Sequence, residues 1–217
     1  MRHIMMLFVC AMGVAVPARA QAPVADTARA NRMLIRLTTK LRADRTLPDS
    51  LRRLTPAELA SPANTTQAVL LDDSTSSLLL RSMAANVHAL PESLCGSFMG
   101  RSAMPAGDLD VILPYADSTT LDHWSTVLER IVRARAAPVR RPAASDSVMR
   151  TVFLRVYGGL KMSDQLRLVQ IAQHPPPSRA DACWSMRVML DAFAALPNGE
   201  AGPFVRGTFG QLGTRRS

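Results

Sequence analysis

Apolar residues recur at helical spacing along most of this 217-residue chain, and prolines mark the ends of the segments that carry them. Met33, Leu34, Leu37 and Leu41, for example, fall on one stripe of a helix. The alternating pattern of a half-buried strand is almost absent. Because amphipathic helices bury their apolar stripes against one another, the sequence predicts an all-α fold, an irregular bundle of about seven helices.

Helix-start and helix-stop signals set the expected boundaries. The tetrapeptide TPAE at 55–58 matches a capping box with proline at the first helical position. Asp72 and Asp73 stand where negative charge favours the start of a helix. The expected helices span about residues 27–43, 56–61, 72–89, 118–136, 146–157, 163–173 and 178–195.

Two regions lack this regularity. Residues 90–117 contain scattered prolines and glycines, and the short run 111–113 is either a lone strand or a buried loop segment. Residues 137–145 hold two prolines and are expected to form a linker. The helix at 146–157, for which a strand is the alternative, is inferred from the i, i+4 spacing of its β-branched and aromatic residues: Val148, Val152, Phe153 and Val156.

The first twenty residues have the three-part layout of a secretory signal peptide. Arg2 and His3 form a basic start, residues 4–16 carry no charge, and Ala18-Arg19-Ala20 matches a signal-peptidase site. We therefore expect residues 1–20 to be removed, leaving residues 21–217 as a single all-α domain that is periplasmic or secreted. No later stretch is apolar for the length of about 20 residues that a transmembrane helix needs.

Cysteine usage agrees with export. Cys10 lies in the expected leader, which leaves Cys95 and Cys183 with only one possible pairing. In an oxidising compartment we expect them to form a disulfide; two separate buried thiols are the alternative. Neither belongs to a C-x-x-C or C-x-x-H motif, which argues against a metal site.

The chain is basic, with 26 Lys and Arg against 17 Asp and Glu, and nearly all the cations are arginine. Either a GC-rich genome or attraction to an acidic surface accounts for this composition. One cluster forms a candidate basic surface, for which a solvated helix end is the alternative: Arg130, Arg133, Arg135, Arg140 and Arg141. Nucleic acid is not expected, because aromatics are 5% of residues and none are interleaved with these arginines.

Signatures of catalysis are lacking. No two histidines are spaced i, i+4, and there is no G-x-S-x-G elbow, P-loop or dinucleotide fingerprint, so no cofactor is expected. Asp108 and Asp110 are interpreted as turn formers. The alternative is a hydrolase-like enzyme whose site lies in the 90–117 region, with His88, Asp108 and Asp110 converging.

Two eighteen-residue segments resemble each other at an offset of 106 residues. RSMAANVHALPESLCGSF at 81–98 and RVMLDAFAALPNGEAGPF at 187–204 share seven identities, including Ala-Leu-Pro. Either an internal duplication or chance, combined with common helix-end chemistry, explains the match.

These observations together favour a non-catalytic helical protein exported to a bacterial envelope. It would bind a protein partner or an anionic envelope component, the latter through residues 130–141.

Overall fold

A computed structural model describes residues 24–97 and 109–214; the expected leader, with Cys10, lies outside these ranges. The described residues form twelve α-helices and two 3-10 helices and contain no strand, so the all-α prediction is confirmed. Seven helices are long: α1 (Thr27–Ala43), α5 (Asp73–Ala89), α8 (Ser118–Ala136), α9 (Asp146–Gly158), α10 (Met162–Gln173), α11 (Arg179–Ala194) and α12 (Asn198–Thr214). The short ones are α2 (Asp49–Arg52), α3 (Pro56–Ala60), α4 (Pro62–Thr65), η1 (Thr66–Leu70), α6 (Glu92–Cys95), α7 (Leu109–Ile112) and η3 (Leu113–Tyr115).

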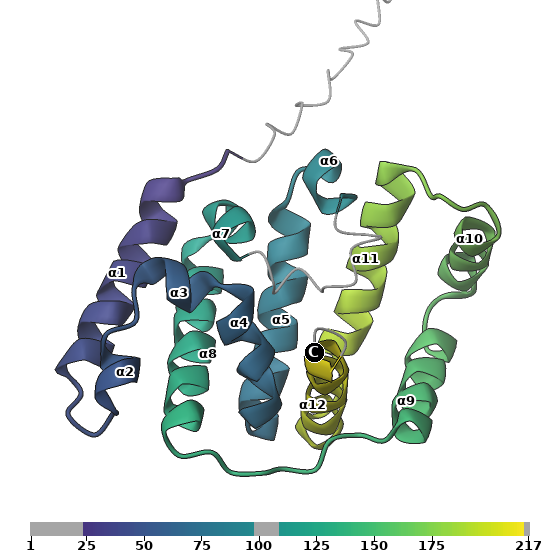
Figure 1. The fold of residues 1–217 in the computed structure, drawn as a ribbon. Helices are drawn as coiled ribbons and strands as arrows, with labels where there is room; N and C mark the ends of the chain where they lie inside the picture. The colour runs from purple at the N-terminus through teal and green to yellow at the C-terminus, as the bar shows by residue number, and fades with distance from the viewer. Residues whose placement is uncertain (1–23, 98–108, 215–217) are drawn as a thin grey trace, which may run out of the picture.

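The α5 helix occupies the centre of the fold. It packs between α8 and α11, and α1 lies on the far side of α8 (Figure 1). The C-terminal α12 packs against both α5 and η1, while α9 and α10 lie at the edge beside α11 (Figure 1). One apolar cluster extends from α1 to α12.

A buried polar pair fixes α5 against α8. The Trp124 indole N–H donates to the side-chain oxygen of Asn86, and the Asn86 amide nitrogen donates to the carbonyl of Ile112 at 2.8 Å. Trp124 and Asn86 are completely buried. Because a buried polar group costs free energy unless it is hydrogen-bonded, this pair both permits and orients the packing of α5, α7 and α8.

Helix starts follow the local signals. Thr55 and Glu58 form the expected capping box, in which the Thr55 backbone N–H donates to the Glu58 carboxylate at 2.7 Å. Asp72 caps α5 as expected, whereas α8 is capped by Asp117, one residue before the expected start. Residues 111–113 belong to α7 and η3 and form no strand.

The 137–145 segment is tied to the body of the protein. The Ala144 N–H donates to the Pro203 carbonyl at 2.9 Å, and the Arg206 Nε donates to the Pro142 carbonyl at 2.7 Å. Arg141, inside the segment, also donates to a backbone carbonyl of η1. Residues 137–145 therefore connect α8 to α9 as expected of a linker, but hydrogen bonds hold this connection against the rest of the protein.

The α12 helix is absent from the sequence prediction. It contains Pro203 and several glycines, which have low helix propensity. Tertiary packing supports it: Phe204 stacks on Phe193 of α11 with ring centroids 4.6 Å apart, and Phe209 is buried. The residues directly after Leu196-Pro197 start this helix, and Phe204 is buried within it.

Candidate functional site

The five arginines of the predicted basic surface have different surroundings. Arg133 on α8 forms ion pairs with Asp44 at 2.7 Å and Glu129 at 3.0 Å, and Glu129 also pairs with Lys40 of α1 at 2.6 Å. Hydrogen bonds from the Thr46 side chain and backbone, and then from Arg133, lower the pKa of Asp44 to about 2. Arg133 therefore belongs to an ion-pair network that joins α8 to α1 and to the segment that follows α1.

Two further arginines are also engaged within the molecule. Arg135 donates to the side-chain oxygen of Asn64 at 2.9 Å, and Arg141 donates to the Leu70 carbonyl at 2.8 Å. Both contacts satisfy polar groups of the short helices α4 and η1. These arginines therefore hold the α3–η1 region against α8 and the connection that follows it.

Arg130 and Arg140 are the two members of the cluster that are exposed. Neither forms a hydrogen bond or ion pair with any other residue of the described ranges. Of the five arginines in the predicted basic surface, two are thus left without an ion-pair or hydrogen-bond partner among the described residues.

The alternative site around residue 88 is arranged differently from the expectation. His88 Nε2 lies 2.8–2.9 Å from both carboxylate oxygens of Asp191 on α11, and both side chains are about half exposed. Asp110 is exposed on α7, and Asp108 lies outside the described residues. The pair is an exposed contact between the last turn of α5 and α11.

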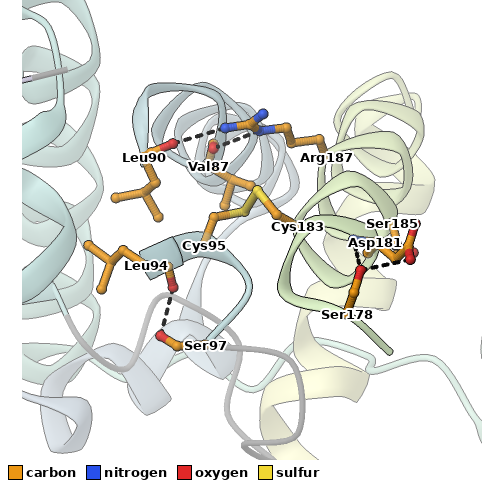
Figure 2. The surroundings of a disulfide bond; sticks show 10 residues. All are labelled: Val87, Leu90, Leu94, Cys95, Ser97, Ser178, Asp181, Cys183, Ser185 and Arg187. Carbon is orange, nitrogen blue, oxygen red and sulfur yellow. Dashed lines mark hydrogen bonds between the residues drawn. A yellow bond between two sulfur atoms is a disulfide. The ribbon is translucent and has the colours of Figure 1, made fainter. Parts of the chain in front are cut away.

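The disulfide joins α6 to α11, as predicted from the sequence. Cys95 and Cys183 are completely buried, with Cα atoms 5.0 Å apart (Figure 2). Beside it, Arg187 donates to the carbonyls of Val87 at 3.2 Å and Leu90 at 2.9 Å, which satisfies the C-terminal end of α5 (Figure 2). The two sulfur atoms therefore form a structural cross-link, and neither is a free thiol that could act as a nucleophile.

An apolar stripe lies on the outside of α10. Met162, Leu166 and Val169 are 68%, 58% and 43% exposed, and no residue of α10 is buried. They are spaced i, i+4 and i+7, so they share one helix face. We call these three residues the outer stripe.

The opposite side of α10 contacts α11. The Arg167 guanidinium lies over the Trp184 ring at 4.1 Å from its centroid and pairs with Asp181 at 3.0 Å. Hydrogen bonds from Ser178 and then Arg167 lower the pKa of Asp181. Arg167 is roughly 130° around the helix from the middle of the outer stripe, so the stripe faces away from the protein.

The α9 helix shows the same division between an inner and an outer face. Val152 and Val156 are buried, but Val148 and Phe153 are about half exposed, because only part of this helix contacts α11 and α12. On the outer side, Leu154 is exposed. The α9 and α10 helices both lie at the edge of the molecule (Figure 1), and each carries exposed apolar side chains.

The sequence shows the apolar spacing of the outer stripe, but it does not show that this row, of the two on α10, is the exposed one. The α10 segment carries two apolar rows, one with Leu168 and Ile171 and one formed by the outer stripe. Helical spacing describes both rows equally well. Only the position of α11 decides which row is partly covered.

The residues that the structure describes contain no helix with the length and hydropathy needed to cross a bilayer. They also contain no group of three or more His, Cys, Asp or Glu side chains arranged to hold a metal ion.

In comparisons with known proteins, no protein-family model, no curated protein and no solved structure matches this chain.

Proposed function

We propose that this chain is an exported, non-catalytic helical protein of a bacterial envelope, which binds a protein partner through the outer stripe of α10. Export is supported by the leader-like residues 1–20 and by the buried cystine, which suits an oxidising compartment. The periplasm or the extracellular space is the corresponding location. The observation that carries the binding proposal is the exposure of Met162, Leu166 and Val169 on one helix face.

The chemistry of α10 favours a protein over a lipid surface. Helices that lie on anionic membranes carry lysines and arginines along their polar face. The only cation within α10 is Arg167, which is held against Trp184 and Asp181. The outer stripe is flanked by neutral glutamines instead, and anchors at i, i+4 and i+7 are the pattern that a partner groove or helix takes up.

Charge indicates the character of the partner. Lys161 immediately precedes the outer stripe, and Arg150 lies on the outer side of α9; both are exposed, and neither forms an ion pair with another described residue. Residues 21–217 hold 24 Lys and Arg against 17 Asp and Glu, a formal charge of +7 once Arg2 and Arg19 leave with the leader. We therefore expect an apolar protein surface with an acidic rim, because opposite charge accelerates encounter and orients the partners.

Site-specific photo-crosslinking in the native host tests this proposal. A photoreactive residue in place of Leu166 should give a saturable adduct of one discrete mass. The same residue in place of Ala172, which is exposed on the flank of α10 roughly 90° from the outer stripe, should give much less. Lys161→Glu should weaken the adduct and Lys161→Arg should preserve it, because both the apolar anchor and the positive charge contribute to the contact.

Three results would contradict the proposal. An adduct of twice the chain mass would identify a second copy as the occupant. Sedimentation with phosphatidylglycerol vesicles that requires Arg130 and Arg140 would identify an anionic surface instead. Equal labelling from positions 166 and 172 would mean that the outer stripe has no specific partner. Export is tested separately, by intact mass: the mature chain should begin at Gln21.

A further inference from the structure

The two segments that match at an offset of 106 residues lie on α5 and α11, which pack side by side in opposite directions (Figure 1). The correspondence extends upstream of the match. Asp72 caps α5 by accepting from the Thr75 N–H at 2.8 Å, and Ser178 caps α11 by accepting from the Asp181 N–H at 3.1 Å. Both the capping and the capped residues are separated by the same 106 positions.

The Leu-Pro breaks also have the same local structure. After the first break, the N–H groups of Leu94 and Cys95 donate to the Pro91 carbonyl at 3.0 and 2.9 Å. After the second, Glu200 and Ala201 donate to the Pro197 carbonyl, both at 2.9 Å. Each long helix therefore ends and is followed by a new helix in the same way.

Two glycines then make reciprocal contacts. A Cβ added to Gly96 would lie 2.7 Å from the Cα of Arg179, the first residue of α11. A Cβ added to Gly202 would lie 2.9 Å from the Cα of Asp73, the first residue of α5. The end of each segment thus abuts the start of the other, which is the reciprocity that a twofold axis requires.

We infer that residues 72–96 and 178–202 are two copies of one helix–Leu-Pro–helix unit, packed about an approximate twofold axis, and that Ser77 and Ala201 occupy the position equivalent to the disulfide. The offset of 106 places Cys95 on Ala201 and Cys183 on Ser77. Ser77 and Ala201 are 1% and 0% exposed, as buried as the cysteines. The Ser77 hydroxyl has no hydrogen-bond partner among the described residues, so no polar contact requires serine there.

The two sides differ in how the second helix is held. On one side α6 has four residues, of which only Cys95 is buried, and a covalent bond fixes it to α11. On the other side α12 has seventeen residues and buries Phe204, Val205 and Phe209. A longer apolar helix needs no bridge to remain docked, so the disulfide is present only where little apolar surface is available. Arg187 and Arg81 depart from the symmetry, since among the residues that the structure describes Arg81 bonds only within its own helix.

A second disulfide tests the inference, which does not depend on the proposed function. The Ser77→Cys/Ala201→Cys variant, refolded under air oxidation, should form a second bond in most molecules. Intact mass detects it as a loss of two hydrogens, and peptide mapping detects it as a cross-link between positions 77 and 201. The matched control is Ser76→Cys/Ala201→Cys. Ser76 is equally buried, but its side chain points about 100° away on the helix, so this pair should remain reduced.

Either of two results would overturn the inference: a folded double variant with free thiols at 77 and 201, or equal oxidation of the control pair. If the variants fail to fold, a measurement on the unaltered protein replaces this test. A nuclear Overhauser contact between the Ala201 methyl and the Ser77 β-protons is then required, and its absence from a complete assignment contradicts the twofold arrangement.

Discussion

Arg206 is a charged side chain in the interior, 3% exposed, and it joins three segments that are distant in sequence. It donates to the carbonyls of Pro142 and Leu71 and to the carboxylate of Asp73, at 2.7–2.9 Å. Nothing in the local sequence distinguishes it from the other arginines. Its role depends on α12 crossing the start of α5.

We predict that Arg206→Met destabilises the protein by about 2–4 kcal/mol, because two carbonyls lose their donor and the Asp73 carboxylate loses its ion-pair partner. Urea unfolding followed by circular dichroism measures the effect. The matched control is Arg150→Met on the exposed face of α9, which should change stability by less than about 0.5 kcal/mol. Similar losses in the two variants would show that Arg206 contributes no more than a surface arginine.

The Asp44 carboxylate makes the free energy of unfolding depend on pH in the acidic range. Its pKa is about 2 in the fold, below the ordinary aspartate value of 3.8, so as the pH falls the unfolded chain binds a proton before the folded chain does. The stability contributed is complete above the unfolded value and is lost as pH falls through the folded value. Partial burial raises the pKa of Glu129, but hydrogen bonds and ion pairs with Lys40 and Arg133 outweigh it, so the net shift is also downward.

We therefore predict that the melting temperature falls between about pH 4 and pH 2, and that it falls less steeply in Asp44→Asn, which has no charge to lose. Asp110→Asn, at an exposed position on α7, is the control and should follow the wild type. Thermal melts across this range measure both. Parallel curves for wild type and Asp44→Asn would rule out this contribution.

At the scale of elements, most helix starts were predictable and one long helix was not. The capping box at Thr55 and the caps at Asp72 and Ser178 depend on residues within one turn, so the sequence indicates them directly. The α12 helix forms against the propensity of its glycines and Pro203, because packing on α5 and η1 outweighs that propensity. A prediction from neighbouring residues cannot include that packing, because α5 and η1 are far from α12 in the sequence.

The glycines of α12 should respond in opposite ways to alanine. At Gly210 an added Cβ would only touch Val69 at 4.0 Å, so Gly210→Ala should stabilise by about 0.5–1 kcal/mol through the helix propensity of alanine. At Gly202 the added atom would overlap Asp73, so Gly202→Ala should destabilise by about 1–3 kcal/mol. Urea midpoints that shift in the same direction for both would contradict the close approach of α12 to α5.

For the whole molecule, the disulfide is the longest-range covalent constraint. It closes a loop over 88 positions and joins the first unit of the twofold pair to the second. The sequence determined its pairing by elimination, since the chain after the expected leader has only two cysteines.

We predict that the Cys95→Ala/Cys183→Ala variant loses about 4–5 kcal/mol, since the unfolded chain regains the freedom that the loop removed. Urea unfolding at constant pH measures the loss. Cys10→Ala is the control and should leave the stability of the mature protein unchanged, because the proposed processing removes the leader. A loss below about 1 kcal/mol, against the several expected from loop closure, would indicate that packing alone holds α6 against α11.

By itself, the sequence determined the helical class, most helix starts and the cysteine pairing, because each depends on neighbouring residues or on simple counting. Only the tertiary structure decided which charges and which apolar faces remain available. Three arginines of the 130–141 cluster are used within the fold, and the outer stripe of α10 is left exposed although its spacing matches that of a core helix. The physical reason is that exposure depends on what lies opposite a side chain, and the residues opposite these come from elements tens of positions away in the chain.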